Sequence, residues 1–176
     1  GDVESLSSAQ SQGVGIRIVV DGRQGFAYAG SLDESAIAET LADARDNVSF
    51  ATFDEFAGLA EPDGVVIPVL DLHRDAMVSF ATADKIALAI ELERVVMAAD
   101  PRISGIESAE YADSISEAAI ASSAGIRTTG SETSCFLATY AMATEGDETQ
   151  TGFGFSVGRE PSDLTPSAAA TEAAER

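Results

Sequence analysis

Apolar residues occupy alternate positions over residues 14–20, which is the period of two expected of a half-buried strand. Asp21-Gly22 follows directly and is a strong hairpin turn, because glycine accepts the positive φ that a two-residue turn demands. Residues 24–29 alternate in a similar way and resemble a return strand. The pattern therefore predicts an antiparallel hairpin near the start of the chain.

Two longer segments carry apolar residues at helical spacing. The first follows Asp33, a residue type that caps helix N-termini, and extends to Val48. The second runs from Thr82 to about Asp100, where Pro101 ends it because proline cannot continue a helix. This second helix has two apolar stripes, and we expect both to be covered by other parts of the protein. One stripe consists of Ile86, Ile90 and Met97, and the other of Leu88, Leu92, Val95 and Val96.

From residue 102 to residue 157 the pattern changes to shorter segments typical of strands, with turns around Gly125 and Gly146. Together with the hairpin they bring the number of strands to about six or seven. Strands in succession combined with two long helices are typical of an α+β fold. We expect a two-layer sandwich, in which a mixed, mainly antiparallel sheet of about six to seven strands carries the two long helices on one face.

The last predicted strand, residues 151–157, places glycine and phenylalanine on opposite faces. Gly152 and Gly154 leave one face without side chains, so that another backbone can approach it closely. Phe153 and Phe155 occupy the other face, and we expect both rings to be buried under the two helices.

Arg159 follows this strand and is the polar residue that we single out. It comes directly after a glycine and shortly before Pro161, so it lies at a change of chain direction. We expect its guanidinium to pair with Asp163 or with an acidic group of a second domain, and we favour a structural ion pair over a substrate contact. Arg159 and Asp163 are therefore the candidate residues of a domain junction.

The charge of the chain limits the kind of partner that it binds. The chain of 176 residues has thirty acidic and ten basic residues and therefore a net charge of −20. This charge repels the phosphate backbone of a nucleic-acid duplex. We expect no direct binding of nucleic acid. No apolar run approaches the roughly 20 residues of a membrane span, and a single cysteine suits a reducing compartment. We therefore expect a cytoplasmic protein without contact to membranes.

No residue has the pattern of a catalytic or metal-binding site. His73 is the only histidine and has no partner at metal-ligand spacing, while Cys135 is the only cysteine and lies in a predicted strand. Thr82 precedes Lys85 by three residues, but at a helix start we interpret it as a cap. The acidic residues of segment 107–117 indicate a solvated face rather than a cation site. We expect no catalytic residue, no metal ligand and no cofactor in this chain.

Several segments, in the same order along the chain, resemble the N-terminal domain of the TldD/PmbA family. None is specific alone, but the ordered set is. The segments are the glycine-flanked hairpin 13–30, Leu32-Asp33-Glu34, Ala99-Asp100-Pro101-Arg102-Ile103, the stretch 130–139, and Gly158-Arg159 followed by Ser162-Asp163-Leu164. The last segment looks more like the PmbA (TldE) branch than the TldD branch.

The resemblance implies a particular organisation. Members of the family are often called modulators of DNA gyrase and form two-subunit zinc peptidases. Residues 1–160 would be the N-terminal domain without the family's first helix and strand, and residues 161–176 would begin a connecting helix towards a C-terminal domain. The TldD branch carries a His-Glu-x-x-x-His helix in that second domain, so zinc would belong to a TldD-type partner. No catalytic residue of the family maps onto this sequence.

The function expected from this resemblance is that of a non-catalytic domain of a PmbA/TldE-like subunit. It would pair with a TldD-like subunit or with itself, and help to enclose an unfolded peptide for cleavage. Two alternatives remain open. The domain would serve assembly alone, without peptide contact, or it would belong to a catalytic TldD-type subunit whose metal motif lies beyond Arg176.

Overall fold

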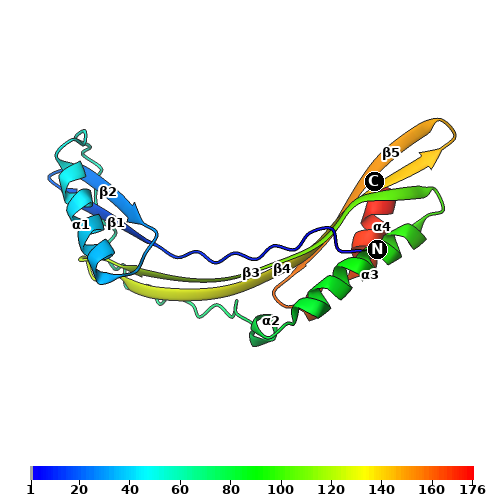
Figure 1. The fold of residues 1–176 in the computed structure, drawn as a ribbon. Coiled ribbons are helices and arrows are strands. Elements are labelled where there is room, and N and C mark those ends of the chain that lie inside the picture. The colour runs from blue at the N-terminus through cyan, green and yellow to red at the C-terminus, as the bar shows by residue number, and fades with distance from the viewer. Residues whose placement is uncertain (1) are drawn as a thin grey trace. The chain divides into compact units, whose positions relative to one another are not determined.

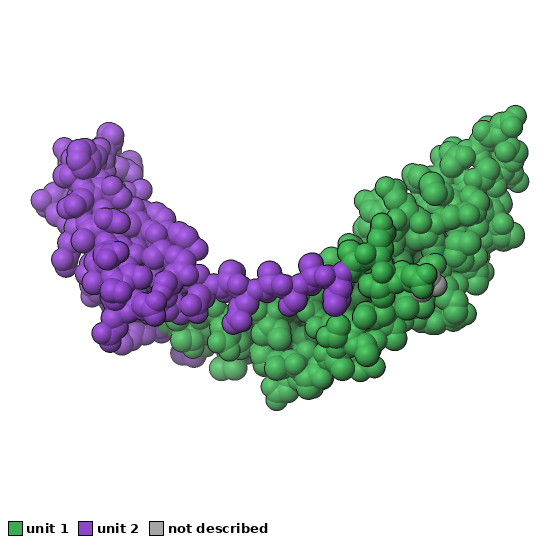
Figure 2. Space-filling view, in the orientation of Figure 1, with its two compact units in different colours: residues 1–5, 67–119, 128–176 green, residues 6–66, 120–127 purple. Residues whose placement is uncertain are grey.

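A computed structural model describes residues 2–176 and divides them into two compact units (Figure 2). Unit 1 consists of residues up to 5 together with 67–119 and 128–176. Unit 2 consists of residues 6–66 and 120–127. No helix in the described part of the chain is long and apolar enough to cross a membrane.

Unit 2 contains the predicted hairpin and the first predicted helix, and both predictions are confirmed. Strand β1 (Val14–Val20) pairs antiparallel with β2 (Arg23–Ala29), and helix α1 (Glu34–Val48) packs on both strands (Figure 1). The turn residues Asp21 and Gly22 have φ angles of 48° and 70°, as a two-residue hairpin turn requires. Gly25 lets α1 approach closely, because a Cβ there would overlap the Ala44 carbonyl oxygen.

Unit 1 holds the second predicted helix and most of a three-stranded sheet. Helix α2 is Asp75–Val78, and α3 is Thr82–Ala99, which confirms the predicted bounds of the long helix. Strands β3 (Ile103–Ala121), β4 (Arg127–Glu145) and β5 (Glu148–Gly158) form a sheet in the order β3-β4-β5. A short 3-10 turn, η1 (Pro161–Asp163), and helix α4 (Pro166–Glu175) follow.

The core of unit 1 lies between this sheet and the helices α3 and α4. Leu92 and Val96 of α3 are fully buried, as is Leu137 of β4. Helix α4 contributes only small residues to this core, and they pack on β5 as well as on α3. The buried alanines of α4 are Ala169, Ala170 and Ala173.

The second apolar stripe of α3 is partly exposed in this structure. The stripe around Leu92 is buried, but Ile90 and Met97 of the other stripe remain 37% and 43% exposed. In the described residues, therefore, only one side of α3 is covered. Cover of the second stripe, by this domain or by a neighbour, stays a prediction.

The α+β class is correct, but the predicted single sheet of about six to seven strands is wrong. Among residues 2–176 the structure has five strands in two sheets, one of two strands and one of three. The reason is strand length: β3 and β4 have 19 residues each, where the sequence pattern suggested several shorter strands. The hairpin β1–β2 forms a sheet of its own. Two short helices, α2 and α4, accompany the two long ones.

The predicted burial of the two phenylalanines is also wrong, although the close approach to the glycine face is confirmed. Helix α4 packs on the glycine face of β5: a Cβ at Gly152 would overlap the Ala173 carbonyl oxygen, and one at Gly154 that of Ala169. The ring face therefore points away from the helices. Phe155 remains 45% exposed and Phe153 is half-buried.

Replacing Gly154 by alanine tests this packing. The added Cβ meets helix backbone, which cannot move aside as a flexible side chain can, so Gly154→Ala should lower the free energy of unfolding by about 2 kcal/mol or more. Gly130→Ala is the matched control, because a Cβ at this β4 glycine meets nothing within 4 Å. Urea denaturation of both variants measures the difference. Equal stabilities would contradict the close packing of α4 on β5.

Candidate functional site

The hydroxyl of Thr133 connects three segments of unit 1 in a buried polar network. The side chain is fully buried in β4 and donates a hydrogen bond of 2.7 Å to the carbonyl oxygen of Arg159. It accepts a hydrogen bond of 3.2 Å from the backbone N–H of Arg74. The N–H of Thr133 donates to the carbonyl oxygen of Leu72 at 3.0 Å. Residues 72–74 are thus held beside β4 at the end of β5.

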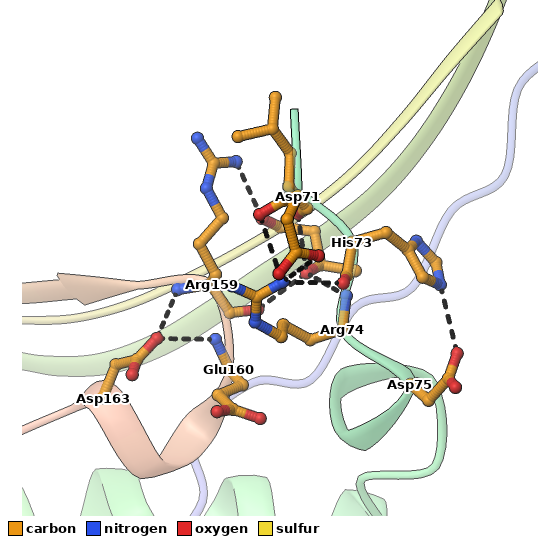
Figure 3. A network of polar contacts seen from close by, with 9 residues as sticks. Asp71, His73, Arg74, Asp75, Arg159, Glu160 and Asp163 are labelled. Carbon is orange, nitrogen blue, oxygen red and sulfur yellow. Dashed lines mark hydrogen bonds and ion pairs between the residues drawn. The ribbon is translucent and has the colours of Figure 1, made fainter. Parts of the chain in front are cut away.

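Arg159 pairs with an acidic residue, but not with the one proposed first. Its Nη1 lies 3.3 Å from Oε2 of Glu132 and donates to the Thr133 carbonyl oxygen at 3.1 Å. Asp163 instead accepts hydrogen bonds from the backbone N–H groups of Arg159, at 2.8 Å, and Glu160, at 3.1 Å (Figure 3). The two predicted residues are therefore close together, and the contact between them is the hydrogen bond from the backbone N–H of Arg159 to the Asp163 carboxylate. Their role at a domain junction stays a prediction.

These hydrogen bonds from the backbone hold the pKa of Asp163 below its usual value of 3.8. A depressed folded-state pKa means that the carboxylate stabilises the fold above its unfolded pKa. This contribution is lost as the pH falls below about 4 and the group becomes protonated. At neutral pH the charged Asp163 carboxylate therefore stabilises the turn that follows β5 through these two hydrogen bonds.

The residues 71–75 add a second set of contacts to the same network (Figure 3). The Nη1 atom of Arg74 donates to Oδ1 of Asp71 at 2.7 Å and to the carbonyl oxygen of His73 at 3.0 Å. His73 Nε2 lies 3.6 Å from Oδ1 of Asp75, and its Nδ1 atom is buried without a hydrogen-bond partner. These contacts stay within residues 71–75, and Asp75 is the carboxylate that they place beside the imidazole.

The other reactive residue types are buried or paired with a neighbouring side chain. Cys135 is fully buried, and burial raises the pKa of its thiol to about 11, so that the nucleophilic thiolate is scarce at neutral pH. Lys85 pairs with Asp113 and lies 6.0 Å from the centre of the Tyr111 ring. Burial raises the pKa of Tyr111, with hydrogen bonding to Asp113 as the next cause. Within the described residues, no three His, Cys, Asp or Glu side chains are placed to hold a metal ion.

The outer face of the sheet carries a feature that the sequence interpretation missed. Side chains of β4 and β5 that point away from the helices include aromatic rings that contact one another. We call this surface the aromatic face. It consists of Phe136, Ala138 and Tyr140 of β4 and Phe153, Phe155 and Val157 of β5. The alternation of these residues with buried ones such as Cys135 and Leu137 is the sequence signal for it.

A threonine-to-valine substitution tests whether the Thr133 hydroxyl holds the network together. Thr133→Val keeps the shape of the side chain but leaves the N–H of Arg74 and the carbonyl oxygen of Arg159 without this partner. We expect a loss of about 1–3 kcal/mol in the free energy of unfolding. The control is Thr129→Val, at an exposed position of the same strand, which should change stability by less than about 0.5 kcal/mol. A neutral result for both variants would show that the network adds no stability.

Metal analysis tests the expectation that this chain holds no zinc. One histidine, one buried cysteine and the absence of a ligand cluster among residues 2–176 give zinc no tetrahedral site. We expect well under one zinc per chain after dialysis against buffer made free of metal. One tightly held zinc ion per chain would refute the expectation.

Comparison with known proteins gives the same family for both parts of the chain. Residues 79–176 match the PmbA/TldA metallopeptidase central domain, and residues 1–48 match the PmbA/TldA metallopeptidase domain 1. The Metalloprotease PmbA of Escherichia coli O157:H7 is 28% identical over 179 residues. That alignment covers 100% of this chain and 39% of the bacterial protein, so the chain spans about two fifths of its relative's length.

Three solved structures share the fold. A proposed modulator of DNA gyrase from Bacteroides thetaiotaomicron has a TM-score of 0.81 and 23% identity, covering 93% of this chain and 38% of its own. A similar protein from Thermotoga maritima has a TM-score of 0.76 and 20% identity, covering 93% and 36%. TldE from Thermococcus kodakarensis has a TM-score of 0.78 and 17% identity, covering 90% and 36%. The matched domains cover more than half of the chain, which therefore belongs to the PmbA/TldD family of metallopeptidases.

Proposed function

We propose that this chain is the non-catalytic N-terminal part of a PmbA/TldE-like subunit in a metallopeptidase that cleaves unfolded peptides. The identity with Metalloprotease PmbA over the whole chain supports the family role. The lack of a metal-ligand cluster among the described residues supports a role in holding the substrate rather than in hydrolysis. Zinc would reside in a TldD-like partner, and the assembly would be cytoplasmic.

The observation that carries this proposal is the free edge of β3. Strand β3 lies at one side of the three-stranded sheet, and among residues 2–176 only β4 pairs with it. Its backbone N–H and C=O groups on the other side are available to an added strand. An extended peptide can pair there through main-chain hydrogen bonds, which read little of its sequence. This property suits a protein that handles many unfolded chains.

The opposite edge of the sheet is less available. The N–H of Phe155 in β5 donates to Oε2 of Glu172 in α4 at 3.1 Å, so a side chain already occupies that position. Beyond the end of β5, residues 72–74 are bound beside β4 by Thr133. We therefore assign the peptide to β3 and not to β5.

Residues 161–176 would lead from this domain towards the remainder of a longer protein. Arg159 and Asp163 fix the chain direction at that point, because they hold the turn between β5 and α4. In this proposal the partner is a TldD-like subunit or a second copy of the same subunit. Residues 1–160 form the part that contacts the peptide.

Peptides with methylated backbone nitrogens test the pairing with β3 in the full-length protein bound to its partner. In an added strand, alternate N–H groups point towards the sheet, so methylation at odd positions and at even positions must act differently. We expect one set to weaken binding at least tenfold and the other to have little effect. Fluorescence anisotropy with the unmethylated peptide as the control measures both. Equal binding of the two sets would refute pairing along a strand edge.

The two other readings of the family membership make different predictions. A pure assembly module would bind its partner subunit but would not crosslink to a photoreactive peptide. A catalytic TldD-type subunit would carry a His-Glu-x-x-x-His motif beyond Arg176, and its full-length sequence would show that motif.

A further inference from the structure

We infer that the aromatic face and Glu110 form a subsite for an arginine or lysine side chain of the bound peptide. This inference rests on the proposed function and adds to it the chemical class of the preferred substrate. It depends on three features of unit 1: stacked rings that remain exposed, a carboxylate without a partner beside them, and the strongly acidic character of the chain.

The rings form a continuous apolar surface across β4 and β5. The strand register places Tyr140 opposite Phe153 and Ala138 opposite Phe155. The ring centres of Tyr140 and Phe153 are 4.8 Å apart, and those of Phe153 and Phe155 are 5.7 Å apart. Tyr140 is nevertheless 47% exposed and Phe155 is 45% exposed. A contiguous apolar surface that remains exposed is a feature of interaction sites.

Glu110 of β3 lines the same shallow depression, whose volume is about 450 Å³. No other described residue forms a hydrogen bond or an ion pair with its carboxylate. Arg159, which follows β5, is engaged with Glu132 and with the backbone of Thr133. The depression therefore has an apolar floor and a negative rim, and among residues 2–176 no cation forms an ion pair with Glu110.

A cationic side chain matches this arrangement better than a neutral or an acidic one. The stem of lysine or arginine can cover the apolar floor while its charged end reaches Glu110. The faces of aromatic rings attract cations, and arginine also stacks on them. The net charge of −20 increases the local concentration of cationic peptides and repels anionic ones. We therefore assign a basic peptide segment, rather than a second copy of this acidic chain, to the aromatic face.

Binding of three matched peptides to the full-length protein tests the inference. The peptides are short and unstructured and differ only in carrying arginine, glutamine or glutamate at every second position. Measurements at about 0.15 M salt screen long-range charge, so that differences report local contacts. We expect the arginine peptide to bind at least fivefold more tightly than the glutamine peptide. Glu110→Gln should weaken arginine-peptide binding about threefold, and Phe155→Ser about threefold to fivefold.

Glu117→Gln is the control for charge alone, because it removes the same charge from an exposed position of β3 that does not line the depression. It should leave the arginine preference unchanged. Equal affinities of the arginine and glutamine peptides, or equal effects of Glu110→Gln and Glu117→Gln, would overturn the inference while leaving the proposed peptide-holding function intact. If the rest of the protein covers the aromatic face, Glu110→Gln and Glu117→Gln will have equal effects. Failure to bind any of the three peptides would overturn the function as well.

Discussion

The contact of α4 with the glycine face of β5 determines which side of the sheet in unit 1 becomes the core. Gly152 and Gly154 remove the side chains that would separate the two elements, and Ala169 and Ala173 present the least bulky helical surface to them. The helix backbone therefore lies almost directly on the strand. Once α4 occupies that face, the alternation of side chains along β5 forces Phe153 and Phe155 to the other. The exposed aromatic face is thus a consequence of how the core is packed.

The same arrangement explains why polar residues gather where β5 ends. Past Gly158 the chain turns into α4, and the sheet loses its third strand beside β4. The buried hydroxyl of Thr133 and the carboxylate of Asp163 satisfy backbone groups that the turn would otherwise leave unpaired. The Thr133 hydroxyl connects β4 with Arg74 and with Arg159, because a hydroxyl both donates and accepts a hydrogen bond. In this network side chains bind backbone groups, and these hydrogen bonds hold the turn after β5 in place.

Local patterns in the sequence were enough to predict some elements and not others. The hairpin at Asp21-Gly22 and the helix ended by Pro101 depend on backbone preferences of a few adjacent residues, and both are present. The number of strands depends on whether a strand continues through positions that break the alternation of apolar and polar residues. β3 and β4 continue through such positions, whereas the sequence pattern predicts shorter strands there. The orientation of β5 depends on which of its two faces a distant helix chooses. Large rings usually lie on the buried face of a strand. Here the glycine face of β5 is buried instead, because the backbone of α4 packs closely against it.

The edge of β3 and the aromatic face belong to one sheet, and this links their proposed roles. A peptide paired with β3 lies about 5 Å from that strand and about 10 Å from β4. Every second side chain of the peptide then points to the side of the sheet that carries Glu110. A short side chain on that side ends near the rim, whereas the long stem of arginine or lysine extends towards the rings of β4. Main-chain pairing would thus hold any extended sequence, and the sheet would add affinity only where a long basic side chain falls in the correct register.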